Sequence, residues 1–197
     1  MAVEMAAGEV GGRRRRLLLR VVGALLTALF FWMMWRQVGA VPPGPRWDAV
    51  PLGDGRFTMR FPGRPEQGAQ QVDQGEEREP LLATQFLYSE GEVVYAAGYV
   101  DYPGGFSRQG TQRLFDESQH TFLKDREGRV VHQEEVGYQQ YPGREIQVAF
   151  ANGLVAWYRL YLVRNRLYIL SVVTTREQRS AVSPHSFLDS FELVRFY

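Results

Sequence analysis

The fold is decided by one stretch near the C-terminal end of the chain. Residues 144–173 read REIQVAFANGLVAWYRLYLVRNRLYILSVV. Two turn signals, Asn152-Gly153 and Arg164-Asn165, divide this stretch into three apolar runs of strand length. Asparagine and glycine both tolerate positive φ, which suits a two-residue type I′ turn at Asn152-Gly153. The stretch therefore predicts a meander of three antiparallel strands.

The turn positions also predict the register of the meander. The first turn gives the cross-strand pairs Ile146–Arg159 and Val148–Trp157, and the second gives Tyr161–Tyr168 and Arg159–Leu170. One face of the meander then carries Ile146, Val148, Phe150, Val155, Trp157, Arg159, Tyr161, Val163, Tyr168, Leu170 and Val172. The opposite face carries Ala149, Leu154, Ala156, Tyr158, Leu160, Leu162, Leu167, Ile169 and Val173. Because both faces are apolar, both must be covered, and we expect these to be central strands.

The remaining sequence around the meander reads mostly as strands with two helices. Strand patterns occupy residues 57–61, 83–89, 93–102, 129–136 and 192–196, and a polar segment at 67–80 is expected to be a solvated loop around a short strand. Apolar residues at helical spacing predict an amphipathic helix over 111–126. A cap residue followed by proline, Ser183-Pro184, predicts a short final helix through Ser190.

The N-terminal segment has the pattern of a membrane anchor. Four arginines, Arg13 to Arg16, precede a long apolar segment, and Trp32 and Trp35 lie toward its far end. As a helix, Leu17 to Trp35 would span roughly 28 Å, about the hydrocarbon thickness of a bilayer. The arginine excess before the segment puts the N-terminus in the cytoplasm. We expect a cytoplasmic basic tail at 1–16, a transmembrane signal-anchor helix at 17–37 and a single-pass protein in the cell membrane, with the lipid bilayer as its first partner.

Two other interpretations of this segment stay open. A signal peptide cleaved near Ala40 would export the same domain without a tether. The bulky Phe30, Phe31 and Trp35 favour an anchor over cleavage. A core helix of a cytoplasmic domain is the third interpretation, and the arginine block and the following prolines argue against it.

A proline-rich linker leads from the anchor to the folded domain. Residues 38–46 include Val41-Pro42-Pro43-Gly44-Pro45, a stiff and extended spacer. Residues 47–197 then form one extracytoplasmic α/β domain of ordinary size. Seven arginines and two glutamates lie in 1–46, which leaves sixteen basic and twenty acidic residues in the domain. A chain that is basic only at one end is not expected to bind nucleic acid.

Several motifs resemble those of a known group of proteins. They are Phe57-x-x-x-Phe61-Pro62-Gly63-x-Pro65, Gly143-Arg144-Glu145, Arg159-x-Tyr161-Leu162-Val163, Arg166-Leu167-Tyr168 and Phe187-Leu188-Asp189-Ser190-Phe191. Together they resemble a group of uncharacterised bacterial exported or membrane-anchored domains, whose order of elements is similar to the Mog1/PsbP-like α/β/α sandwich. The resemblance covers Trp47 to Leu193, and Arg164 stands where glycine is usual in that group. It implies an α+β domain with a mainly antiparallel sheet covered by helices, and it implies binding or assisting assembly of membrane complexes rather than catalysis.

Arg159 is the most informative candidate for a functional contact. It is expected mid-strand among aromatic side chains, where a charge needs a partner because arginine does not lose its proton. One interpretation is a structural pair with a carboxylate of a covering helix, Asp189 first, with Asp116 and Glu117 as alternatives. The other is an anion or ligand contact in an aromatic-lined pocket. The candidate ligand or partner residues are Arg159, Trp157, Tyr161, Tyr168, Tyr141 and Arg144.

The sequence offers little for catalysis or cofactor binding. There is no cysteine, which excludes disulfides, thiolate metal sites and cysteine nucleophiles. The three histidines, His120, His132 and His185, have no metal-ligand spacing, and phosphate-loop, dinucleotide and EF-hand motifs are absent from the sequence. We therefore expect no cofactor and no catalytic residues.

These observations leave three functional hypotheses. The leading one is a membrane-anchored extracytoplasmic binding or assembly-assisting module, with a membrane protein complex as its partner. The alternative is a small-molecule or lipid-binding domain with a pocket between helix and sheet. A hydrolase is a remote alternative, and it requires one of the histidines to meet a serine and a carboxylate in a cleft.

Overall fold

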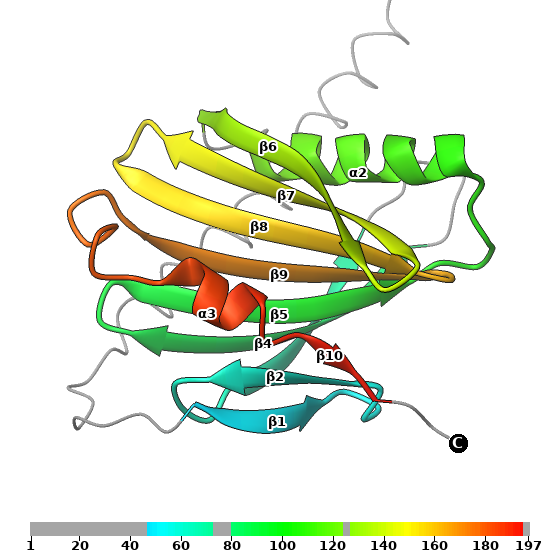
Figure 1. Ribbon diagram of the computed structural model, residues 1–197, viewed down its shortest axis with the longest axis horizontal. Helices are drawn as coiled ribbons and strands as arrows, with labels where there is room; N and C mark the ends of the chain where they lie inside the picture. Colours follow the sequence, from blue (N-terminus) through cyan, green and yellow to red (C-terminus); the bar gives the residue numbers. More distant parts are fainter. Residues whose placement is uncertain (1–46, 73–79, 124–126, 195–197) are drawn as a thin grey trace, which may run out of the picture. The chain divides into compact units, whose positions relative to one another are not determined.

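A computed structural model describes residues 47–72, 80–123 and 127–194 of the chain (Figure 1). The basic tail, the transmembrane segment and the linker expected within residues 1–46 lie outside these ranges. Among the described residues, no helix combines the length and the hydrophobicity needed to cross a bilayer.

A seven-stranded antiparallel sheet forms the centre of the domain, with strand order β3-β4-β5-β9-β8-β7-β6. Its strands are β3 (Glu66–Val72), β4 (Leu81–Glu90), β5 (Val93–Asp101), β6 (Gly128–Tyr138), β7 (Tyr141–Phe150), β8 (Leu154–Val163) and β9 (Arg166–Thr175). The meander predicted from residues 144–173 becomes β7, β8 and β9. Strand β8 is buried along nearly its whole length, which confirms that the meander is central.

The two faces of this sheet are covered differently (Figure 1). Helix α2 (Arg108–Leu123) packs on one face, against β6 and β7. The other face carries the short helix α3 (Pro184–Leu188) and a three-stranded sheet of β1 (Asp48–Leu52), β2 (Phe57–Phe61) and β10 (Glu192–Leu193). The antiparallel α+β class is confirmed. The expected helices cover the sheet only in part, because on one face α3 is accompanied by a second sheet, in which strands 57–61 and 192–193 pair with each other.

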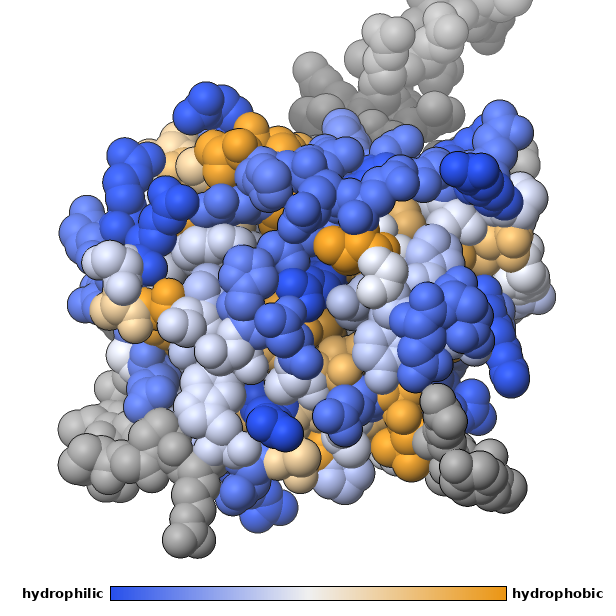
Figure 2. Space-filling model, viewed as in Figure 1, coloured by the Kyte–Doolittle hydropathy of each residue, from blue (hydrophilic) through white to orange (hydrophobic). Residues whose placement is uncertain are grey.

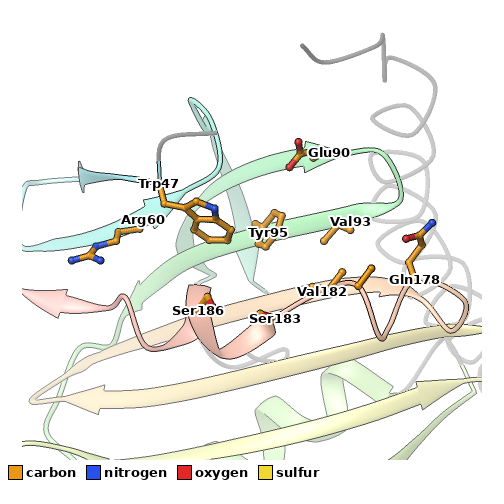
Figure 3. A pocket seen from close by; sticks show the side chains of 10 residues that line it. Trp47, Arg60, Glu90, Val93, Tyr95, Gln178, Val182, Ser183 and Ser186 are labelled. Atoms are coloured by element: carbon orange, nitrogen blue, oxygen red, sulfur yellow. The ribbon is translucent and has the colours of Figure 1, made fainter. Parts of the chain in front are cut away.

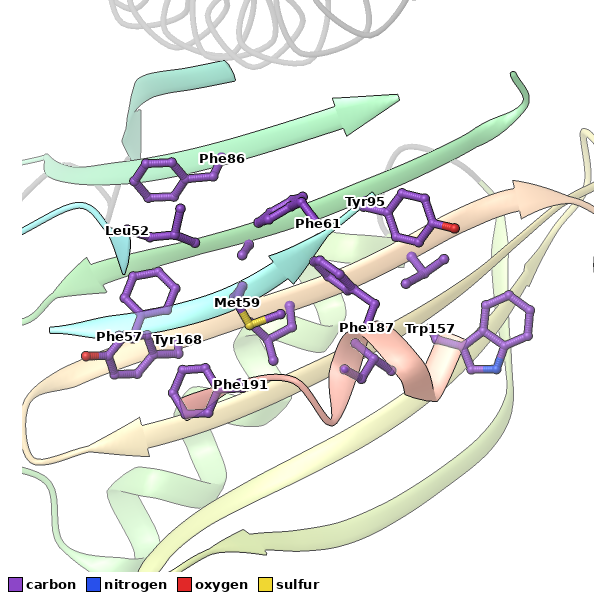
Figure 4. Close-up of a cluster of buried hydrophobic side chains, with 14 of the residues drawn as sticks. Leu52, Phe57, Met59, Phe61, Phe86, Tyr95, Trp157, Tyr168, Phe187 and Phe191 are labelled. Atoms are coloured by element: carbon purple, nitrogen blue, oxygen red, sulfur yellow. The ribbon is translucent and has the colours of Figure 1, made fainter. Parts of the chain in front are cut away.

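A large aromatic core fills the space between the two sheets (Figure 4). Phe57, Met59 and Phe61 alternate along β2 toward the main sheet and are fully buried. They meet Phe187, Leu188 and Phe191 from α3 and its C-terminal side. Burying one such side chain is worth about 1.5–3 kcal/mol, so this second sheet is integral to the fold.

A second core lies between the main sheet and α2. Leu114 and Phe115 of α2 pack against Ile146, Val148 and Leu160. The observed helix begins three residues before the predicted Thr111, and the predicted end at Arg126 falls on residues outside the described ranges. The amphipathic pattern thus predicted the helix, but it missed the first turn, residues 108–110.

The first hairpin of the meander has a different turn from the predicted one. Glu145 is opposite Arg159 and Ile146 is opposite Tyr158, one residue away from the predicted register. The loop contains three residues, 151–153, with only Gly153 at positive φ (86°) and its N–H donating to the Phe150 carbonyl over 3.2 Å. A three-residue loop that ends on a left-handed glycine is the next most common hairpin after the two-residue type.

This slip of one residue moves a whole set of side chains to the other face. Ile146, Val148 and Phe150 were predicted to lie beside Trp157, and they lie on the α2 face with Tyr158 and Leu160 instead. The α3 face carries Glu145 instead, directly opposite Arg159.

The second hairpin has the predicted register, with Tyr161 opposite Tyr168 and Arg159 opposite Leu170. Its turn contains Arg164 at a φ of 58°, in the left-handed region. Asn165 is not among the positive-φ residues, so this turn is not of type I′. A non-glycine residue in this region costs roughly 1–2 kcal/mol of backbone energy.

The first testable consequence concerns this turn. We expect Arg164→Gly to stabilise the domain by about 0.5–1 kcal/mol, because glycine relieves the left-handed strain but adds freedom to the unfolded chain. Urea unfolding of the two proteins would give the difference in midpoint. Gly153→Ala, at a φ of 86° with open space around the position, is the matched control and should shift the midpoint downward. A lower midpoint for Arg164→Gly would contradict the assignment of strain to this residue.

Candidate functional site

Arg159 in the middle of β8 is enclosed by two carboxylates. Its Nε donates to Oε2 of Glu145, directly opposite on β7, over 2.6 Å. Its Nη1 donates to Oδ1 of Asp189, the C-cap residue of α3, also over 2.6 Å. The Arg159 and Glu145 side chains are 9% and 4% exposed, whereas Asp189 is 64% exposed. The pair expected between Arg159 and Asp189 is thus present, and sequence reasoning missed Glu145 because of the register slip.

A histidine completes this group of charges. His185 Nε2 lies 2.9 Å from Oε1 of Glu145, so both carboxylate oxygens have partners. We call Arg159, Glu145, Asp189 and His185 the Arg159 cluster. Since His185 and Asp189 belong to α3 and its cap, the cluster ties this helix to β7 and β8. Burial by itself lowers the pKa of the Arg159 guanidinium, but the hydrogen bonds with Asp189 and Glu145 outweigh it and raise that pKa.

Two further buried arginines are also paired with side chains. Arg144 points to the α2 face, where Nη1 contacts Asp116 Oδ1 at 2.6 Å and Nη2 contacts Gln112 Oε1 at 2.8 Å. It therefore does not share a site with Arg159. Arg166 donates to both oxygens of Asp101 at 2.7 Å, and its guanidinium lies 4.0 Å from the centre of the Tyr99 ring. These pairs hold both guanidiniums against neighbouring carboxylates, and of their nitrogens only Nε of Arg144 is buried without a hydrogen-bond partner within the described residues.

The aromatic candidates are core residues. Trp157, Tyr161 and Tyr168 share a face with Arg159, and their exposed fractions are 7%, 5% and 2%. Tyr161 stacks on Phe191 with ring centres 5.2 Å apart, so these rings are occupied by the core. Tyr141 is half-buried at the start of β7. The ligand pocket expected around Arg159 is thus filled by carboxylates and rings, which counts against that form of the hypothesis.

An open pocket lies elsewhere, beside α3 at the β4–β5 hairpin (Figure 3). It has a volume of about 580 Å³. Its walls come from the residue before β1, β2, the β4–β5 hairpin, the loop after β9 and α3. The lining residues are Trp47, Arg60, Glu90, Val93, Tyr95, Gln178, Ala181, Val182, Ser183 and Ser186.

The pocket combines an aromatic wall with unpaired polar groups. The Trp47 ring meets the Tyr95 ring edge-on, with centres 5.5 Å apart. Burial, aided by the nearby Glu90 charge, raises the pKa of Tyr95 to about 12, so its hydroxyl stays neutral at physiological pH. Within the described ranges, the side chains of Arg60, Ser183 and Ser186 take part in no hydrogen bond or ion pair. Such a mixture of apolar wall and free polar groups is typical of binding sites.

The surface around α3 is better suited to a small binding site than to a large hydrophobic interface. In the view of Figure 2 this face is mostly hydrophilic, and its hydrophobic residues lie in scattered groups. Large permanent interfaces are more hydrophobic than this. The pocket is therefore the better candidate for recognition on this face.

Sequence reasoning missed the pocket for a physical reason. Its residues come from five separate segments that meet only after the two sheets have packed. The position of Trp47 just after the proline-rich linker was the one available signal, because an aromatic residue there needs a surface to pack on.

The described residues do not assemble a hydrolase site. His185 meets a carboxylate, but no contact in the described ranges joins a histidine ring to a serine hydroxyl. His132 lies 3.9 Å from Glu134 with both side chains exposed, and His120 is exposed near the end of α2. Within the same ranges, no group of three or more histidine, aspartate or glutamate residues is arranged to hold a metal ion.

Comparison with known proteins gives structural neighbours only. No family model and no curated protein matches the chain. The solution structure of cyanobacterial PsbP (CyanoP) from Synechocystis sp. PCC 6803 is similar, with a TM-score of 0.52 and 10% identity over 80% of this chain and 98% of that chain. The Saccharomyces cerevisiae Ran-binding protein Mog1p is 10% identical with a TM-score of 0.42, over 77% of this chain and 97% of that chain. The domain therefore has the Mog1/PsbP-like fold that the resemblance implied, and the likeness concerns the fold alone.

The Arg159 cluster generates the second testable consequence. We expect Glu145→Gln to lower the free energy of unfolding by about 3 kcal/mol or more, because it leaves the buried guanidinium without its buried counter-charge. Asp189→Asn removes a carboxylate from the same guanidinium at an exposed position, and it should cost less than about 1 kcal/mol. Urea unfolding of both variants provides the comparison. Equal losses would contradict the view that Glu145 is the main partner of Arg159.

Proposed function

We propose that this chain is a single-pass membrane protein whose domain, residues 47–197, binds a partner outside the cytoplasm and assists assembly of a membrane complex, without catalysis. The observation that carries the proposal is the open pocket of Trp47, Tyr95 and their neighbours. Its aromatic wall and unpaired polar side chains give another molecule both apolar and polar groups to contact. The PsbP-like fold supports binding as the role, since the sequence resemblance implies binding and assembly for such domains.

Tethering makes a modest pocket sufficient for this role. A domain held close to the membrane meets membrane partners at a high effective concentration, so weak contacts are enough. The sequence of residues 17–37 supports the anchor, and the stiff linker at 38–46 supports a domain held at a short distance from the bilayer. Trp47 follows that linker directly, which favours a pocket near the membrane surface.

The chemistry of the pocket indicates what the partner presents. The edge-to-face pair of Trp47 and Tyr95 and the neighbouring Val93 offer a surface for one apolar or aromatic side chain. Arg60 and Glu90 bring opposite charges to the same pocket, so they would favour a polar rim around that side chain. A protruding side chain from a loop of a membrane protein fits this description.

The same pocket supports one second candidate function. A small amphipathic molecule or a lipid would also use an aromatic wall and polar rim of this size. This form of ligand binding does not involve Arg159, whose guanidinium is closed by Glu145 and Asp189. Recovery of no membrane partner in the experiment below would favour this candidate.

The third prediction tests the anchor and its orientation. The chain contains no cysteine, so a single introduced cysteine reports its own location. In intact cells with the outer envelope opened, a membrane-impermeant maleimide should label Gly104→Cys, an exposed position in open space after β5. Glu9→Cys in the basic tail should be labelled only after lysis. Labelling of both variants only after lysis, or recovery of the chain as a freely soluble cytoplasmic protein, would refute the proposed topology.

The fourth prediction tests the pocket. Full-length protein purified from solubilised membranes should retain its partner, and Ser186→Arg should reduce recovery roughly tenfold by filling the pocket at an exposed position. Trp47→Ala should act in the same direction by removing the aromatic wall.

A matched control separates the pocket from general charge effects. Gln109→Arg places the same side chain at an exposed position on α2, on the other face of the sheet, and should retain the partner. Unfolding midpoints of all variants exclude misfolding as the cause of a loss. Full recovery with both pocket variants would show that the partner binds elsewhere.

A further inference from the structure

The two edges of the seven-stranded sheet differ in how they are protected. Edge strands present unpaired backbone N–H and C=O groups, and proteins usually blunt them with charges, bulges or covering segments. Strand β6 forms one edge and β3 the other. The contrast between them indicates which edge is free to pair.

Strand β6 carries the usual protective features. Its pairing with β7 is interrupted by a register shift between Val130 and His132, which leaves Val131 unpaired. Glu134 and Glu135 are exposed along the strand. A bulge together with charges disfavours the addition of another strand.

Strand β3 has neither a bulge nor a charge along its centre. All seven residues pair with β4 in one continuous register, from Glu66 opposite Leu87 to Val72 opposite Leu81. Between Glu66 and Val72 the strand carries no charge and no proline, and it buries no side chain fully. It therefore contributes little to either core, and its pairing with β4 is regular.

A pair of amide side chains links β4 to this edge strand. Gln85 Nε2 on β4 donates to Gln70 Oε1 on β3 over 2.9 Å. The amide nitrogen of Gln70 has no partner within the described residues. Gln67 and Gln71 are also exposed on this strand. Amide side chains on paired strands can form such bonds from one strand to the next, so Gln70 can bond with an added strand.

Gly68 supports a close approach by another strand. An added side chain at this position would meet nothing within 4 Å, so the fold itself does not require glycine there. Its φ is not in the left-handed region either. Glycine inside a strand often marks a place where another backbone or side chain comes close.

We propose that β3 is a self-pairing edge, at which a second copy of this chain adds its own β3 in antiparallel orientation. A two-fold axis at Ala69 places Gln67 of one copy opposite Gln71 of the second copy, in two equivalent amide pairs. The same axis places Gln70 opposite Gly68 of the second copy, where the unpaired amide has room to lie. Glu66 then faces Val72 of the second copy, so no like charges oppose each other.

The resulting dimer is weak in solution and strengthened by tethering. Seven residues of strand pairing bury far less than the roughly 1,200 Å² of a stable interface. Anchored copies in one membrane meet at a high effective concentration, which compensates for the small area. The edge lies outside the proposed pocket, so this inference does not depend on partner binding there.

The fifth prediction tests the edge by crosslinking in the cysteine-free chain. In an antiparallel pair centred on Ala69, the two Cα atoms at this position lie about 4.5–5.5 Å apart, within disulfide range. Full-length Ala69→Cys should therefore form a disulfide-linked dimer under mild oxidation, both in membrane vesicles and in the purified protein at raised concentration. We expect at least roughly tenfold more dimer than for Gln133→Cys, an exposed position on the protected edge β6.

A charge variant makes the test specific. Adding Gln67→Lys and Gln71→Lys to Ala69→Cys opposes lysines across the two-fold axis and should reduce the dimer to the Gln133→Cys level. Dimer formation equal to that of Gln133→Cys, or undiminished by the lysines, would overturn the proposal. Protection of the thiol of Ala69→Cys from maleimide in membranes without crosslinking would also overturn it, because another protein would then cover β3. Crosslinking of the concentrated purified protein does not require a membrane, so this result tests β3 pairing even if the proposed membrane anchor is wrong.

Discussion

The buried charge of Arg159 constrains how the second layer of the domain sits on the main sheet. A guanidinium in the middle of a doubly covered strand cannot be neutralised, so it needs carboxylates in fixed places. Glu145 supplies one from the neighbouring strand, and Asp189 supplies another from the end of α3. Phe187 and Leu188 lie between the two α3 residues of the cluster and are fully buried. The ion pairs and the aromatic core thus fix the position of α3 on the main sheet. This position matters for the pocket, because α3 forms one of its walls.

Much of this arrangement could be read from the sequence, and the misses have a clear cause. The apolar character of both faces identified β8 and β9 as central, and the need to pair Arg159 pointed to Asp189. Glu145 was overlooked because Asn152-Gly153 was taken as a two-residue turn, whereas the loop contains three residues. A turn signal gives the place of a hairpin, but only tertiary packing selects between loops that differ by one residue, and that choice determines which face each side chain occupies.

The candidate site was less accessible to sequence reasoning than the fold. Arginines and aromatic residues are conspicuous in a sequence, but in the folded domain the buried arginines are paired with carboxylates and the aromatic residues pack in the core. The pocket is built from ordinary residues such as Val93, Ser183 and Ser186, which gain significance only by meeting Trp47. The spacing of these residues in the sequence does not predict that they lie together, because they come from opposite ends of the domain and from two different sheets.

The strand order has a consequence for how the chain reaches this structure. Strands β3 to β5 and strands β6 to β9 each pair in the order of the sequence, so every pair within these two groups joins consecutive strands. The pairing of β5 with β9, such as Val94 with Val173, is the only joint of the large described sheet between strands distant in sequence. Its loop-closure entropy must be overcome before any contact across the joint is gained. From this topology we expect the two meanders to form locally, and their docking along β5 and β9 to be the slowest step of folding.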